Sequence, residues 1–161
     1  MVMSILAVLV FLSTAFQKRS VPVSIIVSSS TITKYRNSIG RMDLASMNFS
    51  IYVDLGPVFN WNVKHLYLYL SAEYTTEINA LNQVILWDKI ISRGENPRFD
   101  FHNITNKYVF LDDRYGLRGN KNVSLFLSWH IIPNAGILFL IPASSKTVIS
   151  LPEKYEETKN Y

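Results

Sequence analysis

The sequence predicts an all-β protein, an antiparallel β-sandwich preceded by a single N-terminal transmembrane helix. Apolar side chains alternate with polar ones over several short runs, which is typical of half-buried strands. Turn-forming Gly, Pro and Asn residues separate these runs at the spacing expected of a sandwich. The first 17 residues carry no charged side chain and are mostly apolar, which predicts the helix.

Length and composition indicate one globular domain behind the N-terminal segment. The chain has 161 residues, of which 48% are hydrophobic and 17% charged, and this balance excludes disorder as the main state. The absence of cysteine excludes disulfides, thiolate metal sites and cysteine catalysis. The net charge of +4 comes from scattered basic residues, whereas a nucleic-acid-binding protein usually gathers them on one face. We therefore expect no nucleic-acid partner.

The N-terminal apolar run admits two interpretations. Residues 2–16 would form about 22 Å of helix, against a hydrocarbon core of about 30 Å. Small residues at Ser13 and Ala15 suit cleavage after Ala15, which would release a free secreted or lumenal β-sandwich binding module. Alternatively, residues 1–17 are an uncleaved signal anchor, truncated at its N-terminus in this sequence, and residues 18–161 form the domain behind it.

The orientation signals conflict. Lys18 and Arg19 follow the apolar run, and the positive-inside rule alone would place the C-terminal domain in the cytoplasm. Three N-x-[ST] glycosylation sequons in the domain argue for the lumen instead.

We expect strands from Val21 onward, separated by polar turns. The predicted strands cover residues 49–55, 63–74, 84–91, 108–111, 123–131, 136–141 and 147–151. The run 63–74 is apolar on both faces, which predicts a central strand. Residues 75–82 are polar enough for a loop, and residues 154–161 form a polar C-terminal tail.

The sequons are the candidate modification sites, and they differ in local context. Asn122 follows a turn and ranks first as a glycosylation site, Asn103 sits beside a predicted loop and ranks second, and Asn48 leads into a strand and ranks last.

No residue pattern indicates catalysis or a metal site, so we expect no catalytic residue and no cofactor. The three histidines lack zinc-ligand spacing and have no cysteine partner. Ser128 and His130 share a strand face, but alternate residues lie nearly 7 Å apart along a strand, which is too far for direct proton transfer.

Specific segments resemble the signal peptidase complex subunit 3 family. Within residues 59–94 the pieces WNVK, YLSAEY, ALNQV and LWDKI occur in that order. They are accompanied by residues 14–16, 19–23, 96–97, 107–108, 116–120, 122–124 and 133–138, and by the ending KYEETKNY. The resemblance covers nearly the whole chain, with a diverged patch at about residues 24–46.

The resemblance implies a single-pass type II protein of the endoplasmic-reticulum membrane with a lumenal β-sandwich. It implies a non-catalytic accessory subunit of the complex that removes signal peptides, in which a separate subunit supplies the catalytic serine. The partners would be the catalytic and accessory subunits, the membrane and, indirectly, nascent secretory chains. The family's glycosylation sequon falls at Asn122, and its anchor has residues that precede the start of this sequence.

A structural subunit of this kind would present a rigid surface to its partners. Trp61 and Tyr67 are candidates for such a contact, although strand aromatics are more often part of the core. An independent enzyme is the least supported alternative, because the sequence contains no nucleophile with an adjacent base.

Overall fold

The computed structural model describes residues 1–17, 20–37, 40–112, 116–142 and 146–156. Within these ranges the chain forms one α-helix, one short 3-10 helix and nine strands. The elements are α1 (Val2–Ala15), β1 (Val23–Asn37), β2 (Gly40–Asp54), η1 (Gly56–Val58), β3 (Val63–Tyr74), β4 (Asn82–Ser92), β5 (Arg98–Thr105), β6 (Phe110–Asp112), β7 (Val123–Pro133), β8 (Phe139–Ile141) and β9 (Thr147–Ile149).

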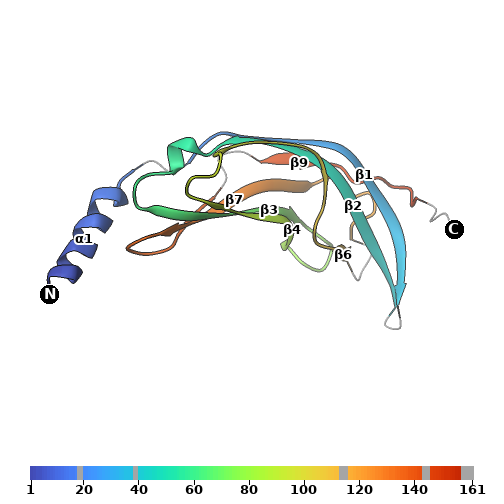
Figure 1. Cartoon of the computed structure of the whole chain (residues 1–161). Coiled ribbons are helices and arrows are strands. Elements are labelled where there is room, and N and C mark those ends of the chain that lie inside the picture. The colour runs from blue at the N-terminus through green and yellow to red at the C-terminus, as the bar shows by residue number, and fades with distance from the viewer. Residues whose placement is uncertain (18–19, 38–39, 113–115, 143–145, 157–161) are drawn as a thin grey trace.

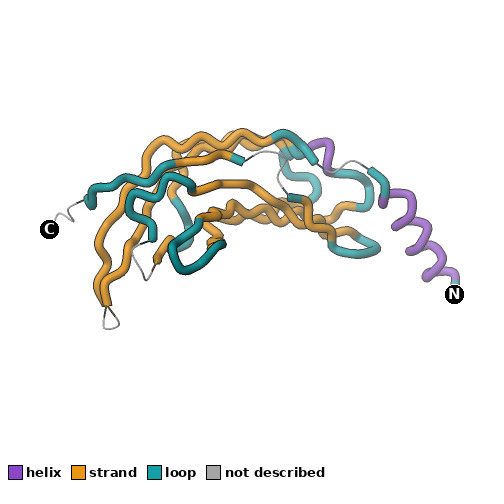
Figure 2. Tube along the Cα trace, turned by 180° about the vertical axis from the view of Figure 1, so that it is seen from behind, coloured by secondary structure: helices purple, strands orange, loops and turns teal. Residues whose placement is uncertain are grey.

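The strands form two antiparallel sheets packed face to face. One sheet has the order β1-β2-β5, with β6 also paired to β2, and the other has the order β4-β3-β7-β8, with β9 also paired to β7. Figure 1 shows the sheets as two layers, with α1 at one end of the sandwich. The view from behind shows the same arrangement, with the β1–β2 hairpin extending away from the helix (Figure 2). The all-β sandwich prediction is confirmed.

Alternation along the long strands builds the core between the sheets. Inward side chains of β2, β3 and β7 are buried while their neighbours face outward, as the period of two along a strand requires. The largest fully buried side chains include Trp129, Phe49 and Phe110. The predicted strand 63–74 coincides with β3, which lies between β4 and β7 as expected of a central strand.

A β-bulge in β4 explains why its burial pattern is irregular. Leu70 pairs with Trp87 and the next residue, Ser71, pairs with Ile85, so Leu86 is the extra residue. Leu86 is fully buried, and its carbonyl accepts hydrogen bonds from the backbone N–H groups of Lys107 and Tyr108 at 2.8 and 3.0 Å. The bulge thus joins β4 to the loop between β5 and β6.

The structure adds two strands, β1 and β5, to the predicted ranges and shifts the ends of others; β2 begins nine residues before the range predicted for it. β5 covers residues that were not assigned to any strand, so Asn103 lies within a strand rather than beside a loop. β8 and β9 are shorter than predicted, and β6 begins two residues later. The polar turn predicted after the strand 108–111 covers residues 112–116, of which 113–115 lie outside the described residues, as do Lys18, Arg19 and residues 157–161 of the tail.

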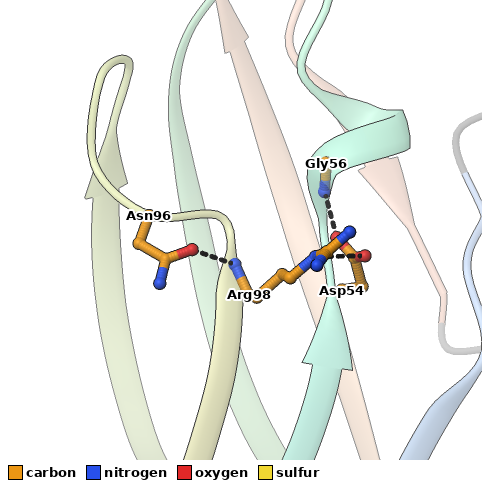
Figure 3. Close-up of polar contacts among 4 residues, drawn as sticks. All are labelled: Asp54, Gly56, Asn96 and Arg98. Carbon is orange, nitrogen blue, oxygen red and sulfur yellow. Dashed lines mark hydrogen bonds and ion pairs between the residues drawn. The ribbon is translucent and has the colours of Figure 1, made fainter.

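Polar contacts secure the end of the first sheet that lies near α1. Asp54 accepts a hydrogen bond from the backbone N–H of Gly56 at 2.9 Å and from Arg98 Nε at 3.0 Å (Figure 3). Asn96 Oδ1 accepts the Arg98 backbone N–H at 3.0 Å. These contacts link the ends of β2 and β5 through the turn that begins η1. They are exposed and therefore contribute little to stability.

Helix α1 is short, and most of its apolar surface is exposed. It has 14 residues, and the side chains of Val2, Ile5, Leu6, Val8, Leu9 and Leu12 lie at least half exposed. No helix in the described part of the chain is both long and apolar enough to cross a bilayer. Phe11 and Thr14, in the last turns of α1, contact the sandwich.

Candidate functional site

The junction between α1 and the sandwich is organised by one buried asparagine. Asn62 Nδ2 donates to Thr14 Oγ1 at 3.2 Å and to the Ala135 carbonyl at 2.9 Å. Asn62 Oδ1 accepts the Ala135 backbone N–H at 3.0 Å. The single amide therefore holds together α1, the start of β3 and the turn between β7 and β8. Thr14 and Asn62 are both buried, so these bonds are shielded from water.

Aromatic packing and a second amide contact surround this bond network. Asn60 Nδ2 donates to Gln17 Oε1 at 2.8 Å, and the Phe11 and Phe139 rings stack with centroids 6.1 Å apart. Gly136 has a φ of +113° and lies so close to Phe11 that a Cβ at this position would meet the ring at 2.7 Å. Glycine is therefore required here by its backbone conformation and by the close approach. Three segments that carry the family resemblance, residues 14–16, 61–64 and 133–138, thus each contribute a contact to this junction through Thr14, Asn62 and Ala135.

Replacing Asn62 with alanine is expected to lower the free energy of unfolding by about 1–2 kcal/mol, because Thr14 and Ala135 lose buried partners. It should also raise the rate of proteolysis between α1 and β1. Urea unfolding and limited proteolysis of the full chain in detergent micelles measure the two effects. Asn79→Ala is the matched control, because Asn79 lies in an exposed loop. Equal losses in both variants would contradict the junction's role.

The first-ranked sequon is accessible at its asparagine. Asn122 is exposed immediately before β7, and its backbone N–H donates to Asn120 Oδ1 at 3.0 Å. The hydroxyl residue of this sequon, Ser124, is half-buried as the second residue of β7. The ranking of Asn122 remains a prediction.

The other two sequons face each other on neighbouring strands. Asn48 pairs with Thr105 across β2 and β5, and Thr105 Oγ1 donates to Asn48 Oδ1 at 2.8 Å. The Asn103 backbone N–H donates to Ser50 Oγ at 3.1 Å, and Asn103 has a φ of +49°. Asn48 is half-buried and Asn103 exposed. In the folded chain the hydroxyl of each sequon is thus bound to the other sequon.

Ser128 and His130 do not form a nucleophile–base pair. Ser128 is buried in β7, whereas the His130 ring is half-buried and stacks on Tyr69 and Tyr67 with centroids 5.8 and 6.4 Å away. Tyr67 and His130 are directly opposite each other on β3 and β7. The histidine is therefore part of an aromatic row on the outer face of the second sheet.

A carboxylate on the same sheet, Asp88, accepts hydrogen bonds at both of its oxygens. Asp88 Oδ1 accepts hydrogen bonds from Lys107 Nζ and from Tyr108 Oη, and Oδ2 accepts one from Tyr67 Oη. The bond from Lys107 lowers the pKa of Asp88 below its ordinary value, and the two tyrosines add to this effect against the opposing effect of burial. Burial, followed by the neighbouring Asp88, raises the pKa of Tyr67. An ionised carboxylate bound in this way ties strands together and is a poor proton acceptor.

The described residues offer shallow depressions and no metal cluster. A depression of about 510 Å³ is lined by the loop after β3 and by residues Gly116 and 118–120. No group of three or more His, Asp or Glu side chains suited to a metal ion occurs among the residues that the structure describes. The features that distinguish the molecule are therefore its surfaces and the junction with α1.

Comparisons with known proteins place the chain in a family. The model of the family described as "Signal peptidase subunit" matches residues 1–154. The chain is 53% identical to the Signal peptidase complex subunit 3 of Gallus gallus over 154 residues, which is 94% of this chain and 86% of that protein. It is 50% identical to the protein of the same name from Homo sapiens, with the same coverage. It is also 48% identical, over 158 residues, to the Adipocyte-related X-chromosome expressed sequence 1 of Mus musculus, covering 96% and 88% of the two chains. The chain belongs to the signal peptidase subunit family.

Proposed function

We propose that the protein is a non-catalytic, structural subunit of the endoplasmic-reticulum signal peptidase complex. The observation that carries this proposal is the identity of about half of all positions to proteins named Signal peptidase complex subunit 3, over nearly the whole chain. The subunit supports the removal of signal peptides from nascent secretory and membrane proteins, and its partners are the catalytic and accessory subunits. It uses no cofactor and binds no nucleic acid.

In this proposal residues 1–17 are the signal anchor and residues 18–161 form the lumenal domain of a single-pass type II protein. The exposed apolar side chains of α1 support the assignment, because such a surface is unfavourable in water and favourable in lipid. The hydrogen bonds from Asn62 to Thr14 and Ala135 support a helix that stays attached to the domain. The sequons at Asn122, Asn103 and Asn48 support lumenal exposure.

The subunit acts by presenting a rigid surface, and the catalytic serine belongs to another chain. Two features support this role. Ser128 is buried whereas His130 stacks in the aromatic row, and both oxygens of Asp88 accept hydrogen bonds. The long sheet pairings of β2, β3 and β7 provide a stiff scaffold.

Reconstitution of the complex with and without this chain tests the function. Omitting the chain is expected to lower the yield of assembled complex and the rate of signal-peptide cleavage. Cleavage that is unchanged without the chain would sink the proposal. The purified chain alone, incubated with the same substrate, should produce no cleavage.

N-terminal sequencing of the mature protein distinguishes the anchor from the alternative of a released module. A retained anchor leaves residues before Ser13 on the protein. A mature N-terminus at Phe16 would show cleavage after Ala15 and would establish the free lumenal or secreted module instead.

Replacing Asn122 with glutamine is expected to remove most of the mobility shift that a glycosidase produces on the microsomal protein, because Asn122 is the exposed sequon outside a strand. Asn48→Gln is the matched control and should leave the shift intact, because Asn48 is half-buried and bound to Thr105. A shift that is lost in the Asn48 variant and kept in the Asn122 variant would reverse the ranking. Gel electrophoresis before and after deglycosylation provides the readout.

A further inference from the structure

The turn between β7 and β8 presents an exposed apolar tip next to α1. The side chains of Ile137 and Leu138 are 66% and 61% exposed, and Leu140 on β8 is also more than half exposed. No Asp, Glu, Lys or Arg occurs between Lys121 and Lys146. Adjacent large apolar side chains at a loop tip without charged neighbours are unfavourable in water and mark a contact surface. We call residues 134–138 the apolar tip.

Contacts along α1 show how the apolar tip lies relative to the helix. Ala135 shares the Asn62 amide with Thr14, near the C-terminal end of α1. Gly136 then meets Phe11, about one helical turn closer to the N-terminus. Between Ala135 and Gly136 the chain therefore runs along the helix toward the N-terminal end of α1, and Ile137 and Leu138 follow. Figure 1 shows this β7–β8 turn beside α1, at the end of the sandwich where the helix lies.

The position of Phe11 indicates the depth that the apolar tip reaches. Phe11 lies about 7.5 Å along the helix from Phe16, the last apolar residue of the run. Apolar groups of proteins that lie in a membrane interface reach about 5–10 Å into the boundary between headgroups and acyl chains. When α1 enters the bilayer, the apolar tip is carried to this boundary by its contact with Phe11.

An exposed tryptophan on the same end of the sandwich suits the headgroup region. Trp61 is 55% exposed and directly precedes Asn62, which bonds both to the helix and to the apolar tip. Tryptophan is enriched at membrane–water interfaces because one part of the ring is apolar and its N–H needs a polar partner. This exposure is the opposite of the core position that strand aromatics usually take.

We propose that the apolar tip inserts into the lipid interface beside α1 and gives the sandwich a second point of attachment to the membrane. The inference rests on the proposed role of α1 as a membrane anchor. Two points of attachment restrict how the domain tilts over the bilayer, whereas a lone helix followed by a linker leaves the tilt free. The apolar tip therefore contacts lipid at the boundary between headgroups and acyl chains, rather than a partner protein.

Site-specific fluorescence tests the insertion directly, since the chain has no native cysteine. Single variants Ile137→Cys and Leu138→Cys of the full chain are labelled with the environment-sensitive dye NBD. The labelled proteins are reconstituted into phosphatidylcholine vesicles that contain phosphatidylcholine with a doxyl quencher at carbon 5. Ile78→Cys and Leu81→Cys are the matched controls. These residues are 62% and 63% exposed on the loop after β3, at the opposite end of that strand and about 35 Å away.

Labels on the apolar tip are expected to be quenched at least about twofold more strongly than labels on the control loop, because only the apolar tip reaches the acyl boundary. Equal quenching at the two loops overturns the inference. A label at Leu6→Cys in α1 separates this failure from that of the anchor. Quenching at Leu6 without quenching at the apolar tip leaves the anchor standing, and no quenching at Leu6 overturns both.

The same cysteine variants in microsomes separate lipid from a protein occupant, with one sample carrying NBD and added doxyl lipid and a second sample carrying a photo-activated cross-linker. If Ile137→Cys is shielded from the doxyl lipid and instead cross-links to another subunit, a protein covers the apolar tip and the inference is wrong. Quenching that persists in the assembled complex supports lipid contact in the native setting.

Discussion

Replacement of Trp129 with alanine is expected to lower the free energy of unfolding by about 3–5 kcal/mol, the largest effect of any single change considered for this protein. Trp129 is fully buried on β7 between the two sheets, where it pairs with Leu68 of β3 and Ile141 of β8. Truncation removes the apolar surface of the indole from the core and leaves a cavity that the paired strands restrict from closing. Urea unfolding followed by circular dichroism measures the change.

Trp61→Ala is the matched control for this substitution. Trp61 is exposed, so its loss should change stability by less than about 0.5 kcal/mol. If both variants lowered the free energy of unfolding by a similar amount, the burial of Trp129 between the two sheets would not explain its effect on stability. The pair also separates fold from surface function, because any effect of Trp61→Ala should appear in membrane or partner contacts.

Replacement of Asp43 with alanine is expected to cost about 2–3 kcal/mol, because a buried carboxylate and both of its partners lose their hydrogen bonds. Asp43 is fully buried in β2. Its Oδ1 accepts the Tyr155 hydroxyl at 2.9 Å, and its Oδ2 accepts the Arg118 backbone N–H at 3.1 Å. Burial, followed by the bond to Asp43, raises the pKa of Tyr155. Asp43 thus fastens the C-terminal segment to the first sheet.

The hydrogen bond from Tyr155 to Asp43 provides a second measurement for Asp43→Ala. Beyond the loss of stability, the variant should expose the segment after β9 to proteases, because the Tyr155 hydroxyl would lose its acceptor. Asp100→Ala is the control, since Asp100 is exposed and its contact with His102 Nε2, at 2.8 Å, is also exposed and therefore contributes little to stability. An unchanged unfolding midpoint and an unchanged digestion pattern for Asp43→Ala would contradict the assignment.

Strong local alternation made the central strands predictable from the sequence. In β3 and β7, Leu66, Leu68 and Leu125 belong to runs whose inward positions are all apolar, so the period of two is clear. β5 was missed because the alternation of Phe99 and Phe101 with Asp100 is short. It follows the turn signal Asn96-Pro97 and is broken by the polar pair His102-Asn103. Its assignment depends on pairing with β2, which no local pattern reveals.

In the candidate site, too, local sequence patterns were predictable, whereas contacts between residues far apart in the sequence were not. The sequons are local patterns and were found, but the hydrogen bond between Thr105 and Asn48 joins residues 57 positions apart. Asn62 was visible within the WNVK segment, yet its partners Thr14 and Ala135 lie 48 and 73 positions away. The exposure of Trp61 also departs from the usual fate of strand aromatics, because the residue lies in the turn before β3 rather than within the strand.

Residues 154–156 of the predicted polar tail are held against the sandwich in the structure. The Tyr155 hydroxyl donates to Asp43, and the Glu156 backbone N–H donates to the Ile32 carbonyl at 2.8 Å. Lys34 and Arg118 lie over the Tyr155 ring at 4.6 and 5.2 Å from its centroid. A lone tyrosine in a polar stretch gives no periodic signal, so this attachment was not predictable from the sequence.

Co-purification from detergent-solubilised microsomes tests most directly whether the protein is a lumenal subunit of the signal peptidase complex. The account predicts that the chain is recovered with signal-peptide-cleaving activity, that intact microsomes protect it from added protease, and that glycosidase treatment increases its mobility. A chain that is degraded in intact microsomes, or that is recovered alone in the soluble lumenal fraction without cleaving activity, would contradict the account.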